Sequence, residues 1–287
     1  MRTRVLVGVL IAIGFLFLCW LDWHRGGFPW GTSALYVAGT WAGMREYLRL
    51  QNAGGAKLPV EFTGALAAAL AVAVILEFWK ARPLGPADMP LGEALLLGIM
   101  ILFMCAEVVR GEPERFRDLA VLFLGFFYIW VLGTYSMKIR HLPAIGEAAF
   151  VWWIVVSKGT DAMAYFTGKA IGRHKLIPKV SPAKTIEGSM GGLVLGCAMG
   201  LVVWKIFPSL QRELPLAWFI PVSLLVQVVG QFGDLAESLM KRSVAVKDSS
   251  KLLPGMGGVL DVIDCLLLSA PVAYTALILA IKLRSHF

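Results

Sequence analysis

The chain has few charged residues and few cysteines for its length. Charged residues make up 16% of its 287 residues, against roughly 25% in soluble globular domains. Hydrophobic residues make up 58%, and the mean hydropathy is +0.73. This composition excludes an ordinary soluble domain and indicates an integral membrane protein.

All four cysteines fall inside expected membrane spans and show no paired spacing: Cys19, Cys105, Cys197 and Cys265. This pattern excludes a disulfide framework and a cysteine zinc site. Long linkers, low-complexity tracts and a separate polar domain are also missing from the sequence. We therefore expect a single membrane domain over 1–287, with a lipid-facing helical half at 1–144 and a catalytic half at 145–287.

Apolar runs of about 17 to 25 residues mark candidate transmembrane helices, so the expected fold class is all-α, a polytopic membrane helical bundle. Nine such runs are present, at about 5–21, 29–44, 61–79, 92–109, 119–137, 145–167, 189–206, 214–232 and 259–283. The second run is the weakest because Gly31, Thr32 and Ser33 dilute it, and eight spans is the alternative count. The first run lacks a small-x-small cleavage site, which favours an uncleaved span over a secretory signal.

The distribution of Lys and Arg over the loops supports nine spans over eight. With nine spans and a cytoplasmic N-terminus, the inner segments hold 17 of the 27 Lys and Arg residues and the outer segments hold nine, in line with the positive-inside rule. The polar loops 168–188 and 233–258 are then both cytoplasmic, and the protein is expected in the cytoplasmic (inner) membrane. The net charge of +8 is assigned to contact with anionic membrane lipids, and no nucleic acid is expected as a partner.

Ionisable residues enter the expected spans mainly after residue 145. Lys158 and Asp161 lie three residues apart, which places them on one face if the helix continues past Gly159. A charge at the centre of a membrane helix costs about 2.5–3.5 kcal/mol. The pair therefore indicates either a salt bridge between helices or the lining of a site.

The loop before the seventh span carries a helix-start signal, Ser181 followed by Pro182. We expect Ser181 to cap a helix whose first turn contains Lys184 and Thr185. Unpaired N–H groups beside a cation and a hydroxyl suit a phosphate, and contact of a basic loop with lipid head groups is the alternative. Glycines then recur at every fourth position, which predicts close packing against another helix: Gly188, Gly192, Gly196 and Gly200.

A row of polar residues ends the eighth span. Asp234, Glu237, Ser238 and Lys241 are spaced i, i+3, i+4 and i+7, so a helix places them on one face. Carboxylates followed by cations are what a metal–triphosphate complex needs. An ordinary ion-pair network at the membrane boundary is the alternative.

A second acidic pair opens the ninth span. Asp261 and Asp264 lie three residues apart, directly after the glycine-rich segment 254–258. Two aspartates at the head of an apolar helix require a cation, and magnesium fits because it prefers one or two carboxylates together with substrate phosphates. The glycines allow backbone N–H groups to approach a phosphate closely.

These residues together resemble the signature of the phosphatidate cytidylyltransferases, also called CDP-diglyceride synthetases. Three segments carry the resemblance, in chain order: Asp161–Gly168, Ser181–Gly188 and Ser238–Asp264. The resemblance implies a nucleotidyltransferase of phospholipid biosynthesis that converts CTP and phosphatidate to CDP-diacylglycerol and pyrophosphate. It also implies Mg²⁺ as cofactor, as one or two divalent ions with a second, monovalent ion beside them, and a homodimer as one arrangement of the chain.

The resemblance assigns roles to individual residues. Metal ligands are expected at Asp234, Asp261 and Asp264. Catalytic residues are expected at Lys241, Lys247 and Asp248. Substrate-binding residues are expected at Asp161, Lys175, Ser181, Lys184, Thr185, Glu187, Ser238, Arg242, Gly257 and Gly258.

The chain departs from the family pattern at two positions. Met256 stands where the family usually has histidine before the paired glycines, and Val262 stands where it usually has arginine between the aspartates. Methionine cannot donate a hydrogen bond to a phosphate, and valine cannot pair with a carboxylate. Two alternatives therefore stay open, a transferase acting on a prenyl or ether-lipid phosphate and a relative that binds cation and lipid phosphate without catalysis.

Overall fold

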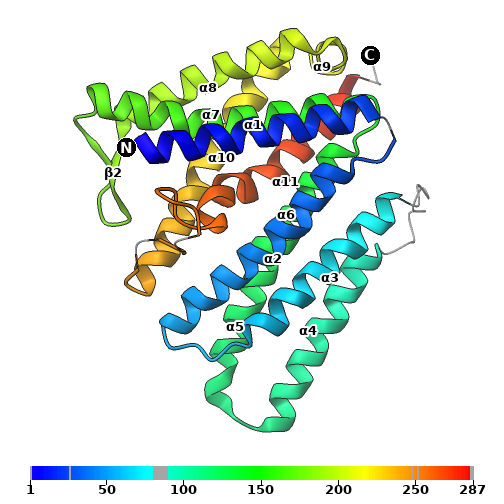
Figure 1. Cartoon of the computed structure of the whole chain (residues 1–287), viewed down its shortest axis with the longest axis vertical. Coiled ribbons are helices and arrows are strands. Elements are labelled where there is room, and N and C mark those ends of the chain that lie inside the picture. Colours follow the sequence, from blue (N-terminus) through cyan, green and yellow to red (C-terminus); the bar gives the residue numbers. More distant parts are fainter. Residues whose placement is uncertain (1, 26, 80–89, 247, 251, 285–287) are drawn as a thin grey trace. The chain divides into compact units, whose positions relative to one another are not determined.

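The computed structural model describes residues 2–25, 27–79, 90–246, 248–250 and 252–284 (Figure 1). In this part of the chain most residues are helical, and one short hairpin supplies the sheet. The all-α membrane fold expected from the sequence is thereby confirmed. The chain divides into two compact units, the first made of Met1–Met137 and Val244–Leu260, and the second of Lys138–Ser243 and Asp261–Phe287.

The helices follow the apolar runs closely. In chain order the first are α1 (Arg2–Arg25), α2 (Trp30–Ala53), α3 (Val60–Trp79), α4 (Leu91–Arg110), η1 (Pro113–Arg115), α5 (Phe116–Gly125), the π-helical η2 (Phe126–Val131) and α6 (Leu132–Arg140). The remainder are α7 (Gly146–Ile171), β1 (Lys175–Ile177), β2 (Ser181–Thr185), α8 (Ile186–Ile206), α9 (Pro208–Glu213), α10 (Leu216–Ser243) and α11 (Val259–Arg284).

Each of the nine expected spans coincides with helix, but not all of these helices are strongly apolar. Among the described residues, seven helical segments are long and apolar enough to cross a membrane. The helices α2 and α7 are not among them. The weak apolar character of α2 agrees with the dilution noted at 29–44, and α7 carries Lys158 and Asp161 in its middle. The count of nine spans stays a prediction.

In the first unit, α2 is buried along one face. Met44, Tyr47 and Leu48 are fully buried, and the Tyr47 hydroxyl donates to the Val121 carbonyl at 2.8 Å. The start of α2 is capped by Asp22 of α1, whose carboxylate accepts hydrogen bonds from the backbone N–H groups of Gly31 and Thr32, both at 2.9 Å. A carboxylate at a helix N-terminus satisfies unpaired N–H groups and complements the helix dipole.

In the second unit, α7 and α8 pack along the glycine stripe. A methyl group built on Gly192 would lie 2.8 Å from both Ala164 Cβ and the Thr160 carbonyl oxygen, and one on Gly188 would lie 2.7 Å from the Ala164 carbonyl oxygen. The two backbones are therefore closer than any side chain would permit. The close packing predicted from the glycine period is confirmed.

Replacement of Gly192 by alanine is expected to lower the apparent melting temperature in detergent, because Ala164 and Thr160 leave no room for the methyl group. Overpacking of this kind lowers the free energy of unfolding by about 1–3 kcal/mol. The matched control is Gly98→Ala in α4, where nothing lies within 4 Å of the added methyl and helix propensity favours alanine. A Gly192 variant as stable as the Gly98 variant would contradict the packing assignment.

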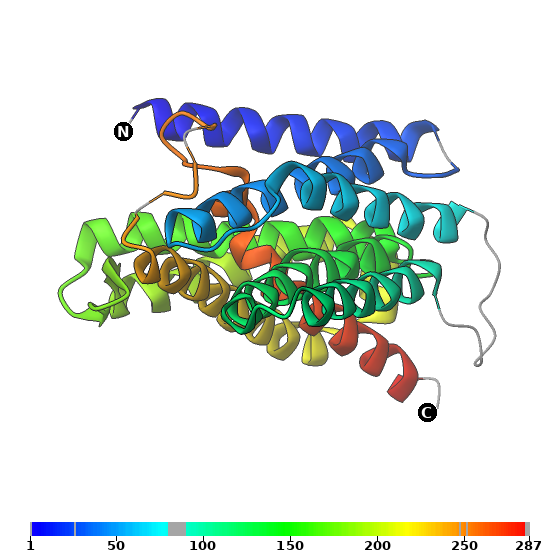
Figure 2. The same cartoon turned by 90° about the horizontal axis from the view of Figure 1, so that it is seen from below.

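The segment Ser181–Thr185 is a strand, which corrects the expected helix start at Ser181. Lys175 pairs with Thr185 and Ile177 with Ser181 in an antiparallel hairpin, which projects from the end of α7 and α8 (Figure 2). The N-cap of α8 is Thr185, whose hydroxyl accepts from the Gly188 N–H at 3.1 Å. Pro182 is compatible with a short edge strand as well as with the first position of a helix, and the pairing of this segment with β1 selects the strand. The helix, with the unpaired N–H groups of its first turn, therefore begins four residues later than expected.

Candidate active site

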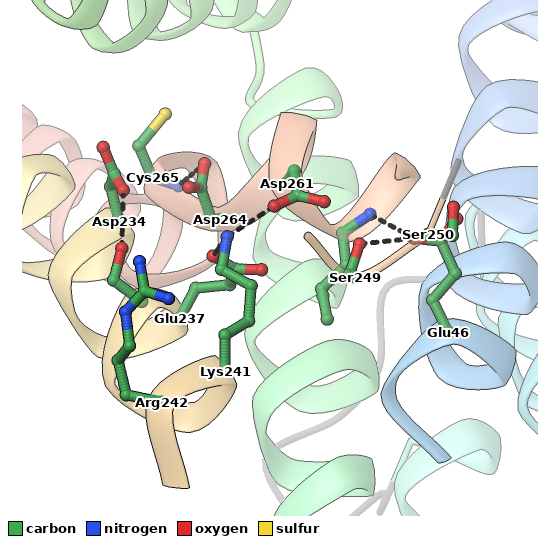
Figure 3. Close-up of polar contacts among 12 residues, drawn as sticks. Glu46, Asp234, Glu237, Lys241, Arg242, Ser249, Ser250, Asp261, Asp264 and Cys265 are labelled. Atoms are coloured by element: carbon green, nitrogen blue, oxygen red, sulfur yellow. Dashed lines mark hydrogen bonds and ion pairs between the residues drawn. The ribbon is translucent and has the colours of Figure 1, made fainter. Parts of the chain in front are cut away.

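Five carboxylates and three lysines form an ion-pair network in the second unit. The carboxylates come from α7, α10 and α11: Asp161, Asp234, Glu237, Asp261 and Asp264. The lysines come from α7, β2 and α10: Lys158, Lys184 and Lys241. Figure 3 shows the side chains of α10 and α11 in this network.

The α10 row forms one face of a continuous helix, as its spacing predicts. Glu237 is fully buried and forms an ion pair with Lys241 one turn later. The Lys241 ammonium also lies 2.5 Å from Asp261 Oδ1. Lys241 therefore links the end of α10 to the first turn of α11.

A second lysine links α7 to α11. Lys158 Nζ lies 3.8 Å from Asp161 Oδ2 and 3.5 Å from Asp264 Oδ1. The helix continues past Gly159, so the shared face expected for Lys158 and Asp161 is confirmed. Asp264 is 5% exposed and also accepts the N–H of Cys265 at 2.7 Å. Lys158 thus joins α7 to α11 through Asp264, in agreement with a salt bridge between helices. The lining of a site by this pair stays a prediction.

The third lysine comes from the hairpin. Lys184 Nζ lies 2.6 Å from Asp234 Oδ2, and the Ser238 hydroxyl is 3.5 Å from Asp234 Oδ1. Three residues that the sequence assigns to metal or substrate are thus brought together. The strand register of Ser181–Thr185 points this lysine at α10, and no helix start at Ser181 is needed for it.

The network has the charge and donors of a cation site. With all groups ionised, the five carboxylates exceed the three ammonium groups by two charges. One ligand atom each of Asp161, Asp264 and Cys265 lies within 4.8 Å of the others. Oxygen ligands suit magnesium, whereas the thiol suits softer ions. One oxygen of Glu237, Oε1, is buried and has no hydrogen-bond partner among the described residues, so the site fits a divalent ion that adds positive charge.

The glycine-rich loop belongs to the first unit and forms a tight turn. The N–H of Met256 donates to the Leu253 carbonyl at 3.0 Å, and Gly255 has φ +78°, as the third position of a Pro-Gly turn requires. The N–H of Gly257 also donates to Leu253, at 3.0 Å. This N–H is therefore paired within the turn, and a phosphate contact at Gly257 stays a prediction.

Other expected site residues lie around these groups. Asp248 is exposed, and Lys247 lies outside the described residues. Lys175 is exposed on β1. Arg242 is exposed, and its Nε lies 3.4 Å from the Val180 carbonyl oxygen. Glu187 accepts hydrogen bonds from the backbone N–H groups of Arg173 and His174, which ties the hairpin to the start of α8.

Two members of the network, Lys158 and Glu237, and the neighbouring Cys265 are absent from the metal, catalytic and substrate-binding roles assigned from the sequence. The period of the α10 row includes Glu237, so its position was detectable although its complete burial was not. Cys265 follows Asp264 directly and comes near Asp161 only through the packing of α7 on α11, where the Trp153 indole donates to Ser269 at 2.9 Å. Sequence spacing gives no signal for such a contact.

Comparison with known proteins gives matches along the whole chain. The model of the cytidylyltransferase family matches residues 2–280. The phosphatidate cytidylyltransferase of Bacillus subtilis is 34% identical over 284 residues, which cover 97% of this chain and 98% of that protein. The protein of the same name from Brucella abortus is 40% identical over 184 residues, covering 64% of this chain and 65% of its own. That from Staphylococcus saprophyticus is 37% identical over 185 residues, covering 64% and 68%.

The matches and the acidic site agree. The family model extends over both units, and the segments that carry the sequence resemblance include three of the five carboxylates of the network, Asp161, Asp261 and Asp264. This polytopic membrane protein belongs to the cytidylyltransferase family.

Proposed function

We propose that the protein transfers CMP from CTP to phosphatidate, giving CDP-diacylglycerol and pyrophosphate. The observation that carries the proposal is the partly buried carboxylate–lysine network of α7, β2, α10 and α11 in a chain that matches its family over residues 2–280. A charged cluster of this size inside membrane helices is expensive unless it serves a site. The names of the relatives support phosphatidate as the acceptor.

The reaction is a substitution at the α-phosphorus of CTP. An oxygen of the phosphatidate phosphate forms the new bond to this phosphorus, the bond to the β-phosphate oxygen breaks, and pyrophosphate leaves with that electron pair. Because the reacting groups are already activated, the protein acts mainly by placing charges and substrates in line. No covalent intermediate with a side chain is required.

The carboxylates are the residues that would hold magnesium. Asp234, Asp261 and Asp264 are the expected ligands, and the position of Asp161 beside Asp264 adds a fourth oxygen donor. Bound magnesium would supply neutralisation of the negative charge on the triphosphate and on pyrophosphate. The oxygen-rich donor set and the excess of two negative charges support one or two divalent ions.

The cations are suited to hold phosphates. Lys184 and Lys241 are paired with carboxylates, and Arg242 is exposed at the end of α10. A phosphate group can therefore take over lysine contacts that the aspartates now make. This exchange keeps the lysines extended towards the site and avoids an unpaired ammonium group in an apolar surrounding.

A transfer assay tests the function. Purified protein in detergent with labelled CTP, magnesium and phosphatidate is expected to release pyrophosphate only when phosphatidate is present. Parallel reactions with a prenyl phosphate and an ether-lipid phosphate identify the acceptor class. Pyrophosphate release with one of these lipids and none with phosphatidate would show that this lipid, and not phosphatidate, is the acceptor. The absence of CTP turnover with every acceptor would contradict the enzyme assignment.

The loops that carry the site are expected to face the cytoplasm, where CTP is found. Lys179 is exposed in the hairpin, and Arg212 is exposed in the expected outer segment. With Cys105 replaced by alanine, a cysteine at Lys179 should resist a membrane-impermeant thiol reagent in intact cells and react after lysis. A cysteine at Arg212 is the control and should react in intact cells. Labelling of position 179 in intact cells would show that the hairpin faces the outside, contrary to the expected orientation.

A further inference from the structure

Glu46 is a buried acidic residue of α2 in the first unit. Glu46 is 5% exposed. Its carboxylate accepts hydrogen bonds from the Ser250 hydroxyl at 2.7 Å and the Ser249 hydroxyl at 3.2 Å (Figure 3). It also accepts the backbone N–H of Leu260 at 2.8 Å. A buried carboxylate is costly unless such partners satisfy its oxygens. Its burial on α2 therefore depends on the loop that supplies these donors.

These donors belong to the segment that carries the family signature. Ser249 and Ser250 follow Asp248, and Leu260 is the second residue of α11. The first N–H groups of a helix have no partner within the helix and form its positive end. Glu46 thus caps α11 from another helix, in the way that Asp22 caps α2.

The paired glycine beside Glu46 gives independent support. A methyl group built on Gly258 would overlap with Glu46 Oε2 and with the Ser249 hydroxyl. Gly258 is itself buried. The close approach of Glu46 thus requires glycine at position 258. This contact explains the residue without any contact to substrate.

We propose that Glu46 is a positioning residue for the acidic site, a role that rests on the proposed function. Leu260 directly precedes Asp261 in α11, and Asp264 lies one turn further on. By holding the Leu260 N–H and both serine hydroxyls, Glu46 fixes where the first turn of α11 begins. Asp261 belongs to this turn and Asp264 follows about one turn later in the same helix, so the positions of both depend on where the helix begins.

Replacement of Glu46 by glutamine tests the role with little change in volume. The neutral amide weakens the three hydrogen bonds, and its NH₂ group cannot accept the Leu260 N–H. We expect kcat to fall by about 10- to 100-fold and the magnesium concentration for half-maximal activity to rise several-fold, with KM for phosphatidate within about twofold. The matched control is Asp22→Asn, which removes charge from a buried helix-capping carboxylate of the same unit that contacts Gly31 and Thr32.

A second variant acts from the other side of the contact. Gly258→Ala leaves Glu46 in place but forces its carboxylate away from the loop, and it should reproduce the changes in kcat and magnesium dependence. Unchanged kinetics in both variants would overturn the proposal. Equal losses in Glu46→Gln and Asp22→Asn, with equal falls in melting temperature, would also overturn it, because they would show a general contribution to stability.

Hydrogen exchange separates this proposal from the proposed function. In Glu46→Ala the peptide covering 252–262 should exchange faster than in unmodified protein, and in Asp22→Asn it should not. This result needs no turnover, so a protein without transferase activity would contradict the function and still test the contact between Glu46 and the loop. Unchanged exchange in Glu46→Ala would show that Glu46 does not hold the first turn of α11.

Discussion

Asp264→Asn is expected to lower kcat at least about 1000-fold while the protein stays folded. Asp264 is buried, lies 3.5 Å from Lys158 and shares its surroundings with Asp161 and Cys265. The amide keeps the volume but removes the charge that would neutralise bound magnesium. A loss of about 4 kcal/mol of transition-state stabilisation corresponds to this factor.

The stability of this variant distinguishes a functional carboxylate from a structural one. Asparagine can still accept the Cys265 N–H, and Lys158 keeps Asp161 as a partner. The apparent melting temperature without magnesium should therefore be unchanged or higher. The control is Glu147→Gln, fourteen residues before Asp161 in α7 and thus about 21 Å away along the helix. An Asp264 variant with more than a tenth of normal kcat would refute the metal assignment.

Lys241→Met should lower both kcat and the melting temperature. The lysine lies between the fully buried Glu237 and Asp261, and its loss leaves both carboxylates without their shared cation. Breaking a buried ion pair from one side costs about 3–5 kcal/mol, which lowers the melting temperature by roughly 5–10 °C in a chain of this size. We expect kcat to fall by at least about 100-fold, because a phosphate loses its cation as well.

The double variant Lys241→Met, Glu237→Gln separates the two effects. Neutralising Glu237 removes the more deeply buried of the two carboxylate charges that lose their cation, so most of the melting temperature should return, as measured by thermal denaturation in detergent. Activity should stay low, because no cation has been restored. Recovery of both would mean that Lys241 acts only by neutralising Glu237.

Features set by local periodicity were predictable from the sequence. A helix places residues three and four apart on one face, so the row from Asp234 to Lys241 and the pair Asp261 and Asp264 follow from their spacing alone. Helix type and approximate ends follow from the length of the apolar runs. The packing of α8 on α7 follows from the glycine period because glycine removes the side chain that would separate two helices.

Contacts between distant segments were not predictable in the same way. Glu46 lies 203 residues before Ser249, and one glutamate beside Arg45 in α2 gives no indication of a partner. The pairing of Lys184 with Asp234 depends on the hairpin. At the start of α8 two signals compete, Ser181 before proline and Thr185 three residues before Gly188. The strand pairing of Lys175 with Thr185 decides for the second.

The modest apolar character of α2 and α7 has a consequence for topology mapping. If both helices failed to cross, seven spans would leave the C-terminus, the hairpin at 175–185 and the segment 244–258 on the same sides as nine spans do. Only the stretch between these two helices would be inverted. A reporter fused to the C-terminus therefore gives one answer for both arrangements, whereas a tag at Glu114, exposed between α4 and α5, is cytoplasmic with nine spans and external with seven.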